Sequence, residues 1–298
     1  MASIPPHIWL LISLLLVTPL GVAQDVKYFV TFGSSTTQTG FQLDKSRPSA
    51  SNPLGNPSLP GWTTSGGLNW LGYLITEFNA STTFSYNLAV GGATTDSVLI
   101  PPYSNTVKSF VDQVDELRLE FASNPPWVSE NLLVGVWIGN NDVGNSFAQD
   151  NKNSLYLQIS AKYVQQLQKL HEIGARNFVI LSAGPQHWTP LMISKGPTSE
   201  VKLKSAVELY NYYLRKALKS FKSQNKQARV WFVNPEKAYL QALDNANTYG
   251  APNSTCENSD GQSCLWWNNY HPGIAIHRLL AEEVAGIIGS PWFSTQAF

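Results

Sequence analysis

The sequence predicts an α/β protein, built as a three-layer α/β/α sandwich around a five-stranded parallel sheet. Five short apolar segments typical of buried strands alternate with longer segments in which apolar residues recur at helical spacing. One of these strands, residues 131–139 (NLLVGVWIG), is a continuous apolar run, as expected of a central parallel strand covered on both faces. Strands that alternate with helices favour parallel pairing with helices packed on the sheet.

The elements follow one another in a regular order. The expected strands are residues 26–32, 82–90, 131–139, 177–183 and 228–234. The expected helices are residues 67–78, 106–123, 154–173, 198–222, 236–245 and 272–288, each with apolar residues at intervals of three or four. Residues 46–67, rich in Pro, Ser and Gly, are expected to be a long loop within the domain, because neither side could complete a sheet alone.

Residues 1–23 have the features of a secretory signal peptide. An apolar run from Ile8 to Ala23 ends in small residues, where a signal peptidase would cut. The alternative is a membrane anchor, which the shortness of the run and the presence of Pro19 disfavour. We therefore expect a secreted, extracellular protein whose residues 24–298 form a single domain.

The composition argues against two classes of partner. Charged residues make up 13% of the chain and the formal net charge is zero, whereas proteins that bind nucleic acids usually carry a basic excess. No stretch after the leader is long and apolar enough to cross a bilayer. We therefore expect neither a nucleic acid nor a membrane as a partner, and we expect a monomer.

Two cysteines and two sequons fit a secreted protein. Cys256 and Cys264 stand close together in CENSDGQSC, and in an oxidising compartment we expect them to form a local disulfide. A metal site would need further ligands at suitable spacing, and the neighbouring sequence offers none. Asn79 and Asn253 begin Asn-X-Ser/Thr sequons and are expected glycosylation sites, although such short matches often arise by chance.

Polar residues gather where the predicted strands end. The segments are FGSS (32–35), NLAVGGATTD (87–96), WIGNNDVGN (137–145) and, before the last helix, WWNNYHPG (266–273). Sites in open α/β sheets form outside the carboxyl ends of the strands, so these segments should meet. A serine with a histidine base, together with fixed N–H donors from glycine and asparagine, is suited to acyl transfer.

In this order, the four segments resemble the motifs of the SGNH (GDSL) hydrolase superfamily and, within it, the fungal secreted acetylesterases of the sixteenth carbohydrate-esterase family. The family opening F-G-D-S-Y-T-x-T-G-F corresponds here to FGSSTTQTGF, residues 32–41. The segments NPLGNPSLPGW and GGLNWLGYL also look like this family, so the resemblance spans nearly the whole mature chain. It implies an SGNH-hydrolase, flavodoxin-like fold and an esterase that uses neither a metal nor a cofactor.

The resemblance implies a role for individual residues. Ser35 is the nucleophile, and Ser34 occupies the position of the family's aspartate. The oxyanion hole comprises Ser35, Gly92 and Asn141, the last from a segment that matches G-x-N-D. Gly91 is the alternative to Gly92.

The family motif D-x-x-H-P corresponds to residues 268–272, NNYHP. His271 is therefore the base, and the aspartate that usually orients it has become Asn268. An amide oxygen can accept the Nδ1 proton but brings no negative charge, and the amide can instead turn its NH2 group toward the ring and favour the wrong tautomer.

Each of these residues also has a structural interpretation. Ser35 could belong to a solvated polar turn, and Ser34 is the alternative nucleophile. His271 could be a structural histidine at the start of a helix. Asn141 could cap the following turn, which Asp142 is expected to brace. We expect His187 and His277 to be structural or to line the substrate site.

Tryptophans stand in or beside the motif-bearing segments, and aromatic rings stack on the apolar faces of sugars. Trp70, Trp188 and Trp267 are the expected substrate-binding residues, although packing in the core or at the rim is the alternative for each. The expected substrate is a small-molecule or oligosaccharide ester, in particular the acetyl ester of a plant cell-wall oligosaccharide. The alternative is a pseudoenzyme that binds saccharide without turnover, because Asn268 and Ser34 replace two carboxylates.

Overall fold

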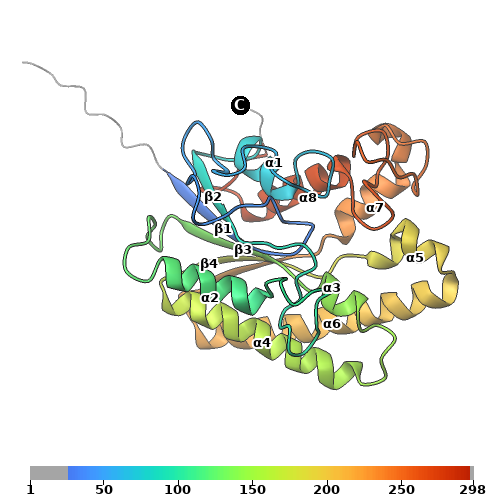
Figure 1. The fold of residues 1–298 in the computed structure, drawn as a ribbon, viewed down its shortest axis with the longest axis horizontal. Helices are drawn as coiled ribbons and strands as arrows, with labels where there is room; N and C mark the ends of the chain where they lie inside the picture. The colour runs from blue at the N-terminus through green and yellow to red at the C-terminus, as the bar shows by residue number, and fades with distance from the viewer. Residues whose placement is uncertain (1–25, 296–298) are drawn as a thin grey trace, which may run out of the picture.

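The computed structural model describes residues 26–295, which contain one sheet of five parallel strands in the order β2-β1-β3-β4-β5 (Figure 1). The strands are β1 (Lys27–Gly33), β2 (Thr83–Asn87), β3 (Leu132–Trp137), β4 (Asn177–Leu181) and β5 (Arg229–Val233). Helices cover both faces, so the predicted three-layer α/β/α sandwich is confirmed.

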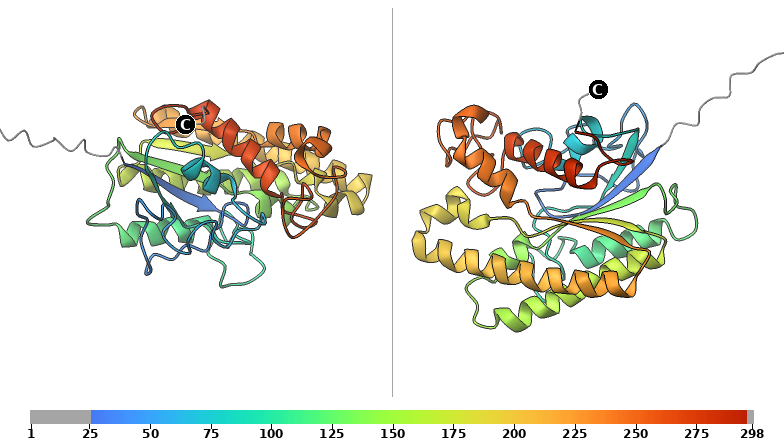
Figure 2. Two further views of the ribbon diagram at one scale, coloured as in Figure 1. Left: turned by 90° about the horizontal axis from the view of Figure 1, so that it is seen from above. Right: turned by 180° about the vertical axis from the view of Figure 1, so that it is seen from behind.

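Each face of the sheet has its own helical layer, as Figures 1 and 2 show. On one side lie α1 (Trp70–Thr76), α7 (Glu236–Asp244) and α8 (Ile274–Ile288). On the other lie α2 (Phe110–Glu120), α4 (Lys152–Glu172) and α6 (Pro197–Gln224). The short helices α3 (Asn140–Gly144) and α5 (Pro190–Ser194) and the 3-10 turns η1 (Gln186–Trp188) and η2 (Ala246–Tyr249) complete the described elements.

The central strands β1 and β3 are largely apolar because alternate side chains enter opposite layers. In β1, Phe29 packs into the core beneath α1 and α8, whereas Val30 and Phe32 pack into the core against α2 and α4. In β3, Leu133 and Val134 divide in the same way, and every residue of the strand is buried. The two cores hold β1 and β3 rigidly in the centre of the sheet, where the first and third motifs begin.

All five strands and six of the helices lie where the sequence predicts them, with bounds that differ by a few residues. The helices α3 and α5 are not predicted, because five residues are too few to show helical periodicity. Residues 34–69 contain neither a helix nor a strand, in agreement with the expected long loop.

The predicted disulfide joins Cys256 and Cys264 and closes a small loop ahead of the histidine segment. Two backbone bonds attach this region to the start of α8, from Gly273 N–H to the Leu265 carbonyl and from Ile274 N–H to the Gly261 carbonyl. Of the two sequon asparagines, Asn253 is exposed and Asn79 is partly buried.

Within residues 26–295, no helix is long and apolar enough to cross a membrane. The expected signal peptide, residues 1–23, lies outside the described residues.

Candidate active site

The four polar segments meet at the carboxyl edge of the sheet. Ser35 follows β1 after one intervening residue, Gly92 lies in the loop after β2, and Asn141 lies in α3, just beyond β3. His271 belongs to the loop that leads into α8. The topology therefore brings residues from both ends of the chain to one place, as the positions of the motifs predicted.

Ser35 is held on a turn that only glycine can begin. Gly33 has φ +155°, and a Cβ at this position would lie 2.5 Å from the Trp137 carbonyl oxygen. The side chain of Gln113 from α2 bonds both backbone groups of Gly33, accepting from its N–H at 3.0 Å and donating to its carbonyl at 2.9 Å. The chain can therefore leave the sheet sharply at the point where Ser35 must be presented.

Ser35 and His271 form a hydrogen-bonded pair. The distance from Ser35 Oγ to His271 Nε2 is 2.8 Å, which is the separation required for proton transfer from a nucleophile to its base. The structure brings Ser35, and not Ser34, to the histidine: Ser34 is buried, and its carbonyl accepts from the N–H groups of Thr37 and Gln38.

Asn268 stands behind the histidine and presents its oxygen. Asn268 Oδ1 lies 3.1 Å from His271 Nδ1. The same oxygen accepts the backbone N–H groups of Tyr270 at 2.9 Å and His271 at 2.8 Å. Because two N–H donors fix the orientation of the amide, its NH2 group is turned away from the ring, and the tautomer with the proton on Nδ1 is favoured. Nε2 is then free to accept the serine proton.

The environment of His271 keeps it neutral. Burial lowers the pKa of His271 from its usual 6.5 to about 4, because the charged imidazolium is poorly solvated. The rings of Tyr270 and Trp267 pack against it, with centroids 5.1 and 6.0 Å away. The imidazole is therefore available as a base across the neutral and mildly acidic range.

N–H groups that could hold an oxyanion are present at all three predicted positions. Within residues 26–295, the backbone N–H groups of Ser35 and Gly92 donate to no other protein atom. Asn141 Nδ2 donates to the Ala93 carbonyl at 2.8 Å, which fixes the amide and leaves its second hydrogen available. Gly92 has φ +82°, a conformation that favours glycine.

Two asparagines brace the loop that carries Ser35. Asn87, at the end of β2, donates to the Thr37 carbonyl at 2.7 Å and to Thr39 Oγ1 at 2.9 Å. Asn69, the N-cap of α1, donates to the carbonyls of Thr37 and Gln38. Neither bracing role is predicted from the sequence, although Asn87 begins the second motif.

The histidine segment has a brace of its own. Tyr270 Oη donates to Gln186 Oε1 at 2.8 Å, which joins this segment to η1 beyond β4. Burial raises the pKa of Tyr270 to about 12, so the phenol stays protonated as a donor. Gly144, at the end of α3, lies against both groups: a Cβ there would be 3.2 Å from Gln186 Oε1 and 3.5 Å from Tyr270 Oη.

Asp142 has a bracing role, but it braces the loop after β2 and not the turn that follows Asn141, where the sequence predicts it. Both carboxylate oxygens lie 3.0 Å from the backbone N–H of Thr95, in the segment that follows Gly92. The side chain is fully buried, and this burial raises the pKa of Asp142 to about 7. Asp142 thereby connects the glycine loop to the helix that carries Asn141.

Of the three tryptophans predicted to bind substrate, one is buried in the core and two are partly exposed. The prediction that Trp70 binds substrate is wrong: its ring is fully buried in the core, and its indole N–H donates to Thr37 Oγ1 at 3.1 Å. Burial of so large an apolar ring in the core stabilises the fold more than its exposure at the surface would. Trp188 and Trp267 are partly exposed, and Trp267 lies beside His271.

The two further histidines singled out from the sequence, His187 and His277, are both buried. His277 Nδ1 accepts the backbone N–H of Trp70 at 3.2 Å, and burial lowers the pKa of His277 to about 3. His187 packs beside Trp188 in η1. In the described part of the chain, no group of three or more His, Cys, Asp or Glu side chains is placed to hold a metal ion.

Comparison with known proteins places the chain in a family. The family described as GDSL-like Lipase/Acylhydrolase matches residues 29–284. An acetylesterase of Thermothelomyces thermophilus is 51% identical over 265 residues, covering 88% of each chain. An acetylesterase of Hypocrea jecorina is 23% identical over 319 residues, covering 89% of each chain.

A solved structure has the same fold. The crystal structure of Axe2, an acetylxylan esterase from Geobacillus stearothermophilus, superposes with a TM-score of 0.51 at 14% sequence identity, covering 91% of this chain and 97% of that chain. The chain belongs to the GDSL-like lipase/acylhydrolase family and is a carboxylic-ester hydrolase.

Proposed function

We propose that this protein is a secreted acetylesterase that removes acetyl groups from plant cell-wall oligosaccharides through a serine acyl-enzyme. The observation that carries the proposal is the 2.8 Å bond between Ser35 Oγ and His271 Nε2, with Asn268 Oδ1 3.1 Å behind Nδ1. Ser35, His271 and Asn268 are therefore hydrogen-bonded in sequence as in a catalytic triad, although the third group is an amide and not a carboxylate.

The first half of the reaction forms the acyl-enzyme. Neutral His271 takes the proton of Ser35 as Oγ attacks the ester carbonyl, and the imidazolium that forms donates through Nδ1 to Asn268 Oδ1. The oxyanion accepts from the N–H groups of Ser35 and Gly92 and from the Asn141 amide. Collapse of the tetrahedral intermediate transfers the proton from Nε2 to the leaving alcohol and leaves the acetyl group on Ser35.

The second half restores the enzyme. A water molecule takes the place of the alcohol, and His271 removes its proton as the water attacks the acetyl-serine. The same donors hold the second oxyanion, and the acetate leaves as Ser35 recovers its proton. Every proton passes through one nitrogen, Nε2, which is why the tautomer that Asn268 selects matters.

Similarity to acetylesterases supports the choice of acyl group. The Thermothelomyces protein of that name is 51% identical to this chain over nearly all of its length. A saccharide as the alcohol part is supported by the partly exposed rings of Trp267 and Trp188, since such rings stack on sugars. Secretion is supported by the apolar leader and by the Cys256–Cys264 disulfide, a bond that persists in oxidising compartments.

The proposal is tested by measuring acetate release from an aryl acetate and from acetylated xylooligosaccharides. The parent should turn over both, and Ser35→Ala should lower kcat by at least about 1,000-fold, because removing a member of such a relay leaves only binding and the oxyanion hole. A matched control is Ser34→Ala, which leaves the serine–histidine pair in place. A serine-reactive phosphonate should label Ser35 in the parent.

The outcomes separate the two functions. Loss of activity in Ser34→Ala, with activity retained in Ser35→Ala, would show that Ser34 is the nucleophile. A parent that neither releases acetate nor reacts with the phosphonate, yet binds the oligosaccharide, would be a saccharide-binding protein.

A further inference from the structure

An exposed tyrosine lies on the glycine of the oxyanion hole. A Cβ placed on Gly92 would lie 2.2 Å from Cε1 of Tyr103, so the edge of the Tyr103 ring rests on the Gly92 backbone. Yet the residue is 81% exposed, because the rest of the ring stands in solvent. An aromatic ring that leaves this much surface uncovered beside a catalytic N–H is not used for core packing.

The ring is also a wall of a large cavity. This cavity of about 920 Å³ lies between residues 97–108 and the outer face of α2, and Tyr103 belongs to its lining. Its size is within the range of about 300–1,000 Å³ that is typical of ligand pockets. Because Tyr103 touches Gly92 on one side and lines the cavity on the other, the cavity adjoins the oxyanion hole.

A second cavity continues the first along the sheet edge. It measures about 560 Å³ and is lined by Val90, which immediately precedes the glycine pair, and by residues 41–44. The two cavities share Lys108, Glu116 and Leu119, and Lys108 Nζ bonds Glu116 Oε1 at 2.8 Å between them. Together they form a groove, hereafter the α2 groove, whose lining includes Val90 and also Tyr103, the residue that touches Gly92.

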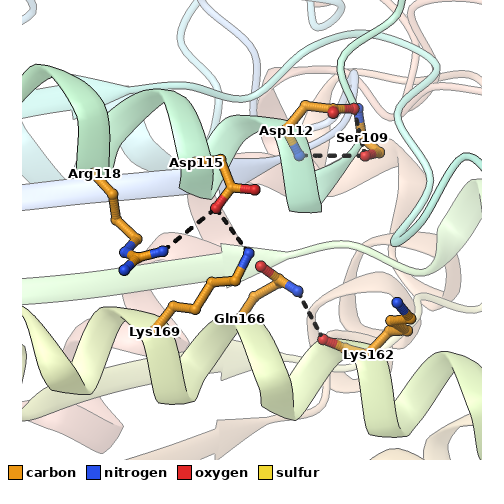
Figure 3. Close-up of polar contacts among 7 residues, drawn as sticks. All are labelled: Ser109, Asp112, Asp115, Arg118, Lys162, Gln166 and Lys169. Carbon is orange, nitrogen blue, oxygen red and sulfur yellow. Dashed lines mark hydrogen bonds and ion pairs between the residues drawn. The ribbon is translucent and has the colours of Figure 1, made fainter.

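The helical wall of the α2 groove is held firmly in place, as Figure 3 shows. Asp115 joins α2 to α4 through Lys169 at 2.7 Å and also pairs with Arg118 at 3.6 Å. At the start of α2, Ser109 and Asp112 form a capping box, in which the Asp112 carboxylate accepts the Ser109 N–H at 2.8 Å. A preformed wall of this kind avoids the cost of ordering the protein around a ligand.

The lining of the α2 groove indicates the chemistry of its ligand. Around Tyr103 stand the hydroxyl and amide side chains of Ser97, Ser104, Asn105 and Thr106. The one cation in this lining, Lys108, is already paired with Glu116, which disfavours an anionic ligand. The lining also contains apolar side chains, among them Pro101, Pro102 and Val107 beside Tyr103. Apolar surface interspersed with hydroxyl and amide groups suits a neutral, hydroxyl-rich molecule with an apolar face.

We propose that the α2 groove binds the neutral sugar units that flank the acetylated one, and that Tyr103 is the ring on which the nearest unit stacks. This inference rests on the proposed function, because it places the remainder of the oligosaccharide whose ester reaches Ser35. The site thus selects a chain of sugars over an isolated acetate ester, and Tyr103 is its specificity-determining residue.

The test compares substrates that do and do not fill the groove. The measured quantity is kcat/KM for acetylated xylohexaose divided by kcat/KM for 4-nitrophenyl acetate, which cancels any general damage to the catalytic groups. Tyr103→Ala should lower this ratio about 5- to 10-fold, since a stacked ring contributes an interaction of this size. Tyr103→Phe should keep the ratio, because the ring and not the hydroxyl group carries the contact.

A variant in the groove that does not contact Gly92, with a control outside the groove, separates the two effects. Leu119→Arg places a bulky cation where the two cavities meet, on a side chain that is 83% exposed, and should lower the same ratio without touching the glycine. The matched control is Tyr212→Ala, an exposed tyrosine on α6 outside the groove, which should leave the ratio unchanged.

Binding is also measured without turnover. Unacetylated xylohexaose should bind the parent more tightly than it binds Tyr103→Ala in calorimetry. An unchanged kinetic ratio together with unchanged binding would overturn the groove while leaving the esterase intact. Tyr103→Ala could instead change the preference between acetyl and butyryl esters and leave the xylohexaose ratio constant. That result would also overturn the proposed sugar site, because Tyr103 would then line the pocket for the acyl group. Absence of all esterase activity would contradict the proposed function instead, and calorimetry would still decide on the groove.

Discussion

Asn268 shows how an amide can take the place of a carboxylate behind a catalytic histidine. The danger of such a replacement is that the amide rotates and offers its NH2 group to the ring. Here the backbone N–H groups of Tyr270 and His271 both require an acceptor, and Asn268 Oδ1 supplies it. The tautomer is therefore retained, and what the site lacks is the negative charge alone.

Asn268→Asp should consequently raise kcat for acetyl esters about 10-fold, since a charge-assisted bond to the imidazolium is stronger than a neutral one by roughly 1–2 kcal/mol. KM should change little, because the gain arises only in the transition state. Steady-state kinetics on the aryl acetate measures both constants.

The same substitution should move the pH profile. In the parent, the pKa of His271 is lowered to about 4, so kcat/KM should fall only as the pH approaches that value. A carboxylate beside the ring favours the protonated form and raises this pKa, so the acid limb of Asn268→Asp should lie at higher pH. Identical limbs in a folded variant would show that the new charge does not reach the histidine. Asn268→Asp should also be measured together with Ser34→Asp, because the resemblance places Ser34 at the position of the family's aspartate.

At the scale of the elements, the catalytic groups depend on bonds between loops. The Tyr270–Gln186 bond joins the histidine segment to η1, and both groups lie against α3, which carries Asn141. The proposed base, His271, and the proposed oxyanion donor, Asn141, are therefore positioned relative to each other through this contact. Tyr270 is a positioning residue, since its hydroxyl group bonds Gln186 and not the reacting atoms.

Tyr270→Phe should lower kcat about 5-fold with little effect on KM, because it removes one buried hydrogen bond and keeps the ring against His271. A double-mutant cycle with Gln186→Leu should show that the second change adds little once the first is made. The control is Tyr249→Phe, which breaks another Tyr–Gln bond, to Gln241, far from the site. Additive losses in kcat would show that the two side chains act independently.

The sequence predicts the elements well and their mutual contacts poorly. Strand and helix positions follow from local periodicity, and Ser35, Asn268 and His271 lie in short motifs that can be read without a structure. The Gln186–Tyr270 bond joins residues 84 positions apart, and nothing local in either segment signals it. The prediction for Trp70 is wrong for the same reason: a tryptophan beside a motif has the same local pattern whether its ring points outward to bind substrate or into the core.

For the molecule as a whole, buried titratable groups act on stability in opposite directions. His271 and His277 have pKa values lowered to about 4 and about 3, so the unfolded chain binds their protons first, and stability falls as the pH drops below about 6.5. Asp142 has a pKa raised to about 7, so its folded form holds a proton that the unfolded chain releases, and stability falls as the pH rises from about 4 to 7.

Asp142→Asn should remove the second effect. Its stability relative to the parent should improve with rising pH between about 4 and 7, by up to about 1.4 kcal/mol per pH unit at the steepest point. Guanidinium denaturation at several pH values measures this difference. The control is Asp150→Asn, at an exposed position, whose difference from the parent should be flat. A flat difference for Asp142→Asn as well would mean that Asp142 ionises equally in both states.

The Ser35–His271 bond spans 236 positions of the chain. During synthesis at about 5–20 residues per second, roughly 10–50 s pass between addition of the nucleophile and addition of its base. Throughout that interval the nascent chain exposes a serine without a general base, so it cannot attack cellular esters whatever part of the sheet has already formed. The separation of the pair along the chain thus delays the onset of hydrolysis until the α8 region has been made.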